Sequence, residues 1–140
     1  MNRLLHLSLF CALALTAVAC GGSTSTTSPT TATPTAGTEA FTGTIAPGGA
    51  AIRNFTASAS GTASVTLLTT DPNSTLLGLG IGIPGTDSGN CDMTKTLQTR
   101  AGSTAQLTAS VEAGTYCAGV FDIGTVGTNG VVVSMTVAHP

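Results

Sequence analysis

The side chains that could act in catalysis are few in this chain of 140 residues. Nucleophilic catalysis by a Ser-His-Asp or Cys-His arrangement needs an imidazole that is held in a packed site. His6 lies in an apolar N-terminal segment that is expected to be removed, and His139 is the penultimate residue. We therefore predict that the chain is not an enzyme and uses no cofactor.

Acidic side chains offer a second kind of chemistry, because paired carboxylates do acid–base work and carboxylates bind calcium together with carbonyl oxygens. The segment Asp87-Ser88-Gly89-Asn90-Cys91-Asp92 is the densest local group, but it lacks the ligand count and spacing of an EF-hand loop. Asp87 and Asp92 are therefore only candidates for weak calcium binding. A structural role is favoured, because Asp in turns normally bonds the backbone. The acids in or beside predicted turns are Asp71, Asp87, Asp92, Glu112 and Asp122.

Residues 1–19 combine Arg3 with an apolar stretch, which is typical of a signal peptide and too short for a membrane-spanning helix. The segment Ala17-Val18-Ala19-Cys20 resembles a bacterial lipobox, in which the first mature thiol takes a diacylglycerol. A lipidated Cys20 would anchor an exported protein to a bacterial membrane, facing the periplasm or the cell surface. The alternative is ordinary secretion, because the same segment fits the small-x-small rule and has Ala17 where a lipobox most often has Leu.

Two cysteines remain after Cys11 leaves with the signal peptide and Cys20 is acylated. An even pair in an exported protein predicts a disulfide, here between Cys91 and Cys117. The loop-closure account gives such a bond roughly 3.5 kcal/mol of stabilisation. A zinc site is disfavoured, because the only other mature ligand of the right type, His139, lies next to the terminus.

The lipidated cysteine and the residues after it, 20–39, form a predicted linker. The stretch is rich in Thr, Ser, Gly and Pro and has no apolar period. Such a chain buries too little apolar surface to offset its ordering entropy. It would hold the domain about 20–25 Å from the anchor.

Residues 40–140 show apolar residues with period two, separated by clusters of Gly, Pro, Asn and Asp, which predicts an all-β domain. Small polar residues fill the alternate positions, so we expect two antiparallel sheets packed face to face over one core, with about seven or eight strands. The opposite parities of Ile52 and Phe55 predict a bulge or a strand boundary between them. The expected strands are 41–45, 51–59, 62–69, 76–83, 104–111, 115–122 and 131–138.

The segment Leu77-Gly78-Leu79-Gly80-Ile81-Gly82-Ile83 has an apolar face and a face without side chains. It lacks the motif of a phosphate-binding loop. A ligand groove is one interpretation of the glycine face. We favour the other, in which the glycines let a neighbouring segment of the chain approach closely.

Several short motifs together resemble a bacterial pre-peptidase C-terminal domain. They are Phe41-Thr42-Gly43-Thr44-Ile45, Phe55-Thr56-Ala57, Ala63-Ser64-Val65-Thr66-Leu67 and the stretch from Ala113-Gly114-Thr115-Tyr116 to Asp122. The resemblance covers nearly all of residues 40–138 and implies a jelly-roll-like β-sandwich with a binding, accessory or secretion role and no catalysis. The family's acidic middle strand is replaced by residues 77–83, so metal binding by that strand is not expected.

The amino-acid composition excludes one class of function and favours others. Charged residues make up 7% of the chain and the formal net charge is −2, so no basic stripe is present and nucleic-acid binding is excluded. The leading hypothesis is a non-enzymatic envelope lipoprotein whose β-sandwich binds a protein or a polysaccharide. One alternative is a structural or adhesive coat component. Another is a secreted, non-lipidated domain with weak calcium binding.

Overall fold

The computed structural model describes residues 36–87 and 89–140, and within these residues the protein is an all-β fold without a helix. It has eight strands, and burial alternates along those of residues 37–45, 61–71, 107–111 and 131–139, as the sequence pattern predicts. The strands are β1 (Gly37–Ile45), β2 (Ala50–Ala57), β3 (Gly61–Asp71), β4 (Leu77–Pro84), β5 (Cys91–Thr99), β6 (Leu107–Val111), β7 (Gly114–Phe121) and β8 (Val131–His139).

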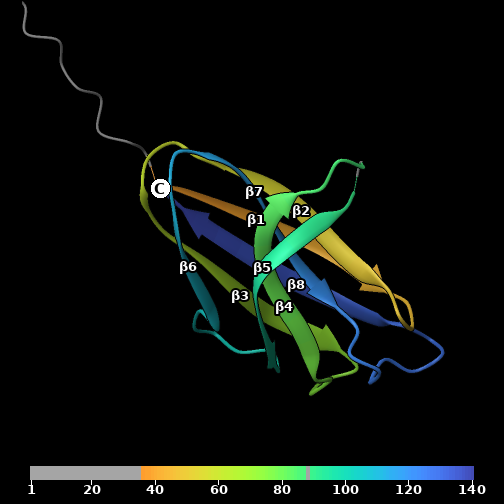
Figure 1. The fold of residues 1–140 in the computed structure, drawn as a ribbon. Coiled ribbons are helices and arrows are strands. Elements are labelled where there is room, and N and C mark those ends of the chain that lie inside the picture. Colours follow the sequence, from red (N-terminus) through yellow and green to blue (C-terminus); the bar gives the residue numbers. More distant parts are fainter. Residues whose placement is uncertain (1–35, 88) are drawn as a thin grey trace, which may run out of the picture. The chain divides into compact units, whose positions relative to one another are not determined.

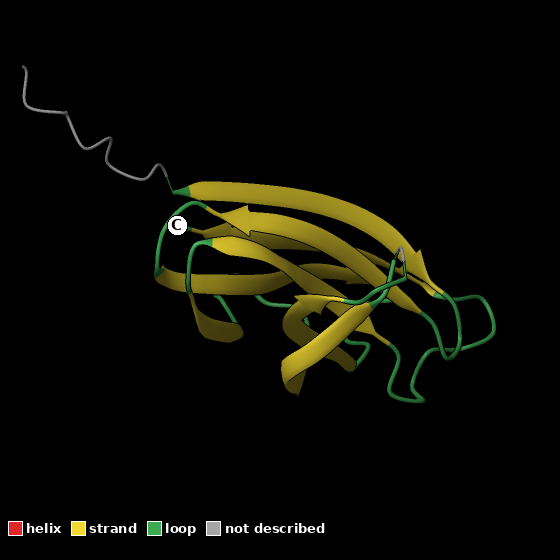
Figure 2. Ribbon diagram, turned by 45° about the horizontal axis from the view of Figure 1, so that its top comes forward, coloured by secondary structure: helices red, strands yellow, loops and turns green. Residues whose placement is uncertain are grey.

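The strands form two four-stranded antiparallel sheets, which confirms the predicted sandwich (Figures 1 and 2). One sheet has the order β1-β8-β3-β6 and the other has the order β2-β7-β4-β5. Every connection crosses from one sheet to the other, except that between β4 and β5, which are neighbours in one sheet. This order is that of a jelly roll with two Greek keys.

The core lies between the sheets and is built by the alternation of the strands. In β3 the inward residues Ala63, Val65 and Leu67 are fully buried, and four alternate residues of β8 are buried in the same way. A buried Leu, Ile or Val side chain contributes roughly 1.5–3 kcal/mol relative to an exposed one. The largest buried side chains are Ile45, Leu67, Leu77, Leu79, Ile81, Leu107, Met135, Val65, Val120, Val131, Val133 and Val137.

Two cationic side chains contact residues on the edge strand of the opposite sheet. Arg53 on β2 lies over the ring of Phe41 on β1, with its guanidinium carbon 5.4 Å from the ring centroid. On the other side, Lys95 on β5 donates a hydrogen bond of 2.6 Å from Nζ to the carbonyl oxygen of Thr108 on β6. The long side chains thus connect edge strands of opposite sheets.

The strand register gives the domain two distinct ends. At the entry end, the first residue of β1, Gly37, pairs with His139 at the end of β8. At the opposite end, which we call the distal end, Ile45 pairs with Val131. The loops that join β1 to β2, β3 to β4 and β7 to β8 lie at the distal end, and the connection from β5 to β6 starts there and runs back along β3 (Figure 1).

The structure corrects three expectations about the strands. Residues 91–99 form a strand, β5, that the sequence pattern did not predict, because this edge strand is mostly exposed and polar. Strand β2 is regular between Ile52 and Phe55, because Ile52 turns outward and covers Gly119. Strand β1 begins at Gly37, so the last three residues of the predicted linker are part of the sheet.

Thr70 on β3 is the basis of a first prediction. It is 2% exposed, and its hydroxyl has no hydrogen-bond partner among the residues that the structure describes. Thr70→Val keeps the shape and removes the unsatisfied hydroxyl, so we expect the free energy of unfolding to rise by about 1 kcal/mol in urea denaturation. Thr70→Ser is the matched control, because it keeps the hydroxyl, loses the methyl group and should be less stable than wild type. A less stable Val variant would contradict the prediction.

Candidate functional site

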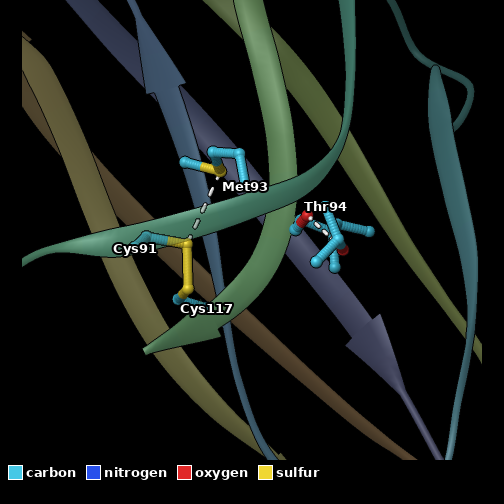
Figure 3. The surroundings of a disulfide bond; sticks show 5 residues. Cys91, Met93, Thr94 and Cys117 are labelled. Atoms are coloured by element: carbon cyan, nitrogen blue, oxygen red, sulfur yellow. Dashed lines mark hydrogen bonds between the residues drawn. A yellow bond between two sulfur atoms is a disulfide. The ribbon is translucent and has the colours of Figure 1, made fainter. Parts of the chain in front are cut away.

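The predicted disulfide between Cys91 and Cys117 is present, and it spans three strands (Figure 3). Cys91 lies on β5 and Cys117 lies on β7, the two neighbours of β4. Strands two positions apart in a flat sheet are separated by roughly 9–10 Å, whereas the Cα atoms of the two cysteines are 5.9 Å apart. The first part of β5 therefore leaves the plane of the sheet and crosses over β4, as Figure 3 shows.

The glycine face of β4 makes this crossing feasible. A Cβ atom at Gly82 would collide with the backbone carbonyl of Asp92 on β5. At Gly80 it would meet the side chain of Met93, and at Gly78 the ring of Phe121. The close-approach interpretation of this segment is confirmed, and the proposed groove is filled by the protein itself.

A bulge in β5 marks the point where the crossing begins. The register of β4 against β5 shifts between Ile81 and Gly82, and the hydroxyl of Thr94 donates a 3.2 Å hydrogen bond to the carbonyl oxygen of Ile81. Met93 lies beside the disulfide, with its sulfur 3.5 Å from the sulfur of Cys91. Because a disulfide sulfur carries no hydrogen, this is a van der Waals contact. The disulfide region is thus a packed structural site.

At the distal end, the carboxylate of Asp122 organises two loops. Its Oδ2 accepts a 2.8 Å hydrogen bond from the N–H of Gly48, in the loop from β1 to β2. Its Oδ1 accepts from the N–H groups of Gly124, Thr125 and Val126 at 2.8–3.0 Å. The bond from Gly48 first, and then the other three, outweigh partial desolvation and lower the pKa of Asp122 from 3.8 to about 2.

The stability of the protein at acid pH should depend on the ionisation of Asp122. The folded-state pKa lies below the unfolded value, so the stabilisation is complete above about pH 4 and is lost as the pH falls through about 2. Asp122→Asn places an N–H donor at Oδ2 against the N–H of Gly48. We expect this variant to have a lower Tm than wild type at pH 7, and the difference to shrink toward pH 2.

The control for this prediction is Asp92→Asn, whose side chain is exposed and makes no hydrogen bond within the described residues. It should follow the wild-type Tm across the pH range. A difference between Asp122→Asn and wild type that stays constant from pH 7 to pH 2 would contradict the assignment.

Side chains also join the other distal loops. The hydroxyl of Thr125, in the loop from β7 to β8, donates a hydrogen bond to the carbonyl of Leu76 in the loop from β3 to β4. The guanidinium of Arg100, after β5, donates to the carbonyl of Ser74 in that same loop. With Asp122, these contacts connect the three distal loops and the start of the connection from β5 to β6 into one platform.

The platform contains a cavity of about 230 Å³. One wall is residues 125–131, and the other is formed by Pro72 and Thr75. The lining has no ionisable side chain; its polar side chains are threonine hydroxyls and the amide of Asn129. This concave surface, at the end of the domain opposite the chain's entry, is the candidate binding site.

The position of His139, at the entry end, differs from the one expected from the sequence. Its penultimate position suggested that it lies outside the folded interior, yet its side chain is only 10% exposed. Strand β8 continues to this residue and pairs it with Gly37, over which the ring lies because Gly37 has no side chain. The ring stacks on Phe55 at 5.3 Å, and Nε2 lies 3.5 Å from a carboxylate oxygen of Glu39. The imidazole is therefore held in a packed site, with one acid beside it.

The other sequence-derived site residues are separated from the distal cavity. Asp87 lies in the turn between β4 and β5, and Asp92 lies within β5 rather than in a turn. Within residues 36–87 and 89–140 there is no cluster of three or more His, Cys, Asp or Glu side chains that could hold a metal ion. The predicted lipidation site Cys20, the signal peptide and most of the linker lie outside the described residues.

The sequence reasoning did not find the cavity. Its walls come from two segments about 50 residues apart, and much of its lining is the backbone of a loop. The one local signal was Asp122, a turn acid followed by Gly124 and Thr125, but four other acids in turns looked equally suitable.

Comparison of the chain with protein-family models, curated proteins and solved structures finds no match. In the part of the chain that the structure describes, no helix is long and apolar enough to cross a membrane.

Proposed function

We propose that the protein is a non-enzymatic lipoprotein of the bacterial envelope, and that its distal platform binds a protein or polysaccharide ligand. The observation that carries this proposal is the opposition of the two ends of the domain. The chain enters β1 at Gly37, while three cross-connected loops and a cavity lie at the other end. A domain tethered at its entry end would present this platform away from the membrane.

The anchor and export parts of the proposal rest on the sequence of residues 1–39. The resemblance to the pre-peptidase C-terminal domain is likewise a proposal that rests on the motifs. Mass spectrometry of the mature protein tests the anchor: the expected N-terminal residue is an acylated Cys20. An unmodified Cys20 would overturn lipidation and favour simple secretion.

Ligand binding is tested with the mature protein immobilised on beads and exposed separately to envelope proteins and to purified envelope polysaccharides. We expect one saturable ligand, and we expect Asp122→Asn to weaken its binding because the variant loosens two distal loops. Equal binding by a variant at the entry end, Glu39→Gln, is the control. A ligand that binds Asp122→Asn and wild type equally would place the site elsewhere.

Edge strands support the second candidate function, a structural or adhesive coat component. Strands β1, β6, β2 and β5 lie at the edges of the two sheets and leave backbone groups available for pairing with another chain. This function predicts that the purified mature protein self-associates with increasing concentration in analytical ultracentrifugation. A monomer at all concentrations would reject it.

A further inference from the structure

The lining of the distal cavity has no charged side chain. Within the described residues the cations are Arg53, Lys95 and Arg100, and each one contacts a ring or a backbone carbonyl outside the lining. The nearest acid along the loop, Asp122, accepts four backbone N–H groups. A ligand held by ion pairs therefore finds no partner in the cavity.

Two threonine hydroxyls, one on each wall of the cavity, offer hydrogen-bond acceptors. The hydroxyl of Thr75 donates its hydrogen to the carbonyl of Pro72 at 2.9 Å, and that of Thr125 donates to the carbonyl of Leu76. A hydroxyl oxygen that has donated its only hydrogen still has acceptor lone pairs. Both Oγ atoms are thus set as acceptors, and a ligand must bring donors to them.

The wall of residues 125–131 also offers donors. The N–H groups of residues 124–126 bond to Asp122, and that of Gly130 bonds to the carbonyl of Gly127. The N–H groups of Gly127, Thr128 and Asn129 find no acceptor among the described residues, and the side-chain amide of Asn129 adds two donors and one acceptor oxygen. A ligand can therefore bring acceptors to the free N–H groups of this wall.

Hydroxyl groups meet both requirements, since each one donates and accepts. We propose that the cavity binds a single neutral sugar ring, the end unit of a polysaccharide, through the hydroxyls of Thr75 and Thr125 and the loop of residues 127–129. This inference rests on the proposed binding function and identifies its site and ligand class. An anionic sugar is disfavoured, because the charged carboxylate of Asp122 lies behind the same loop and the lining carries no cation to pair with an anion.

The volume and the lining of the cavity determine which part of a glycan can bind and how tightly it binds. Pockets for drug-sized ligands have roughly 300–1,000 Å³, and this cavity has about 230 Å³. It therefore accepts one ring at the end of a glycan and not the interior of a chain. No aromatic side chain lines it, so the stacking that strengthens many sugar sites is missing. We expect dissociation constants of about 1 mM, near −4 kcal/mol.

The test uses ¹⁵N-labelled mature protein titrated with the methyl glycosides of glucose, galactose, mannose and N-acetylglucosamine, and with glucuronate as the anionic probe. We expect at least one neutral glycoside to shift the amide signals of residues 125–131 saturably, and glucuronate to cause no shift. Saturable shifts confined to another surface, or an equal response to glucuronate, would overturn the inference.

Two variants and a control complete the design. A Cβ atom at Gly127 would meet no atom within 4 Å, so Gly127→Leu can fold, and because it adds a bulky side chain to a lining residue it should abolish the shifts. Asn129→Ala removes two donors and should weaken binding about tenfold, equivalent to about 1.4 kcal/mol. Thr42→Val, an exposed change on β1, should bind like wild type. Unchanged binding by Gly127→Leu and Asn129→Ala would overturn the site.

The outcomes separate this inference from the broader function. If no sugar binds while the immobilised protein still captures one saturable envelope protein, the sugar site is wrong and the binding function stands. If a polysaccharide binds wild type and both cavity variants equally, only the location is wrong. If neither proteins nor polysaccharides bind, the proposed function itself fails.

Discussion

Gly82→Ala will lower the free energy of unfolding by about 3 kcal/mol, the upper part of the range for overpacking substitutions. The new Cβ would collide with the carbonyl oxygen of Asp92, which belongs to the backbone of β5. Backbone cannot move aside by rotating a side chain, so the whole crossing segment would have to lift from β4. Urea denaturation of the variant and the wild type measures the loss.

Gly80→Ala is the matched comparison, because its obstacle is different. There the Cβ would meet the side chain of Met93, which has three rotatable bonds and can move. We expect a cost of about 1 kcal/mol, at the lower end of the overpacking range. In a Met93→Ala background Gly80→Ala should cost less than in wild type, whereas Gly82→Ala should cost the same. Equal costs at the two glycines, or rescue of Gly82→Ala by Met93→Ala, would contradict the assignment.

The second large effect concerns the disulfide. Replacing Cys91 and Cys117 together by alanine should lower the free energy of unfolding by about 3.5 kcal/mol, from the entropy that the unfolded chain regains. The bond joins residues 26 positions apart, and it closes a loop that contains β5, β6 and the first half of β7. That loop visits both sheets, so the cross-link restricts the unfolded chain across the whole sandwich.

The measurement compares three proteins in urea: wild type, the double variant, and wild type with its disulfide reduced. The reduced protein and the double variant should lose similar stability, because both lose the same covalent constraint. Hydrogen exchange should show that the loss opens residues 91–95 first, where β5 crosses β4. A loss below about 1 kcal/mol would show that packing alone holds the crossing, contrary to the loop-closure account.

The sequence predicted the core well because periodicity depends on burial of one face. Val65 and Leu67 of β3, and Val133 and Met135 of β8, alternate with polar residues along strands central to their sheet. Any strand with one face in the core must show this pattern, whatever its neighbours are. The disulfide was predictable for a different reason, since the expected removal of Cys11 and acylation of Cys20 would leave only one pair of cysteines.

Strand β5 was not predictable in this way because its bulge changes the face of its apolar residues. Met93 lies outside the sheet against the glycines of β4, whereas Leu97 packs against the core, although the two have the same parity. The bulge near Thr94 produces the change of face, and no residue pattern in the sequence around it indicates a bulge. The distal cavity escaped prediction because it depends on loops that only the fold brings together.

The opposition of the entry and distal ends also has a mechanical consequence. A pull between Gly37 and a ligand held at the distal loops would act along β1, so the backbone bonds over the nine paired positions of β1 and β8 would share the load in shear. A pull between Gly37 and Pro140, which lie at the same end, would instead open these pairs one after another. A domain held in this way would resist drag between a membrane and a fixed ligand better than its modest core suggests, and single-molecule pulling in the two directions should give a higher rupture force for the first.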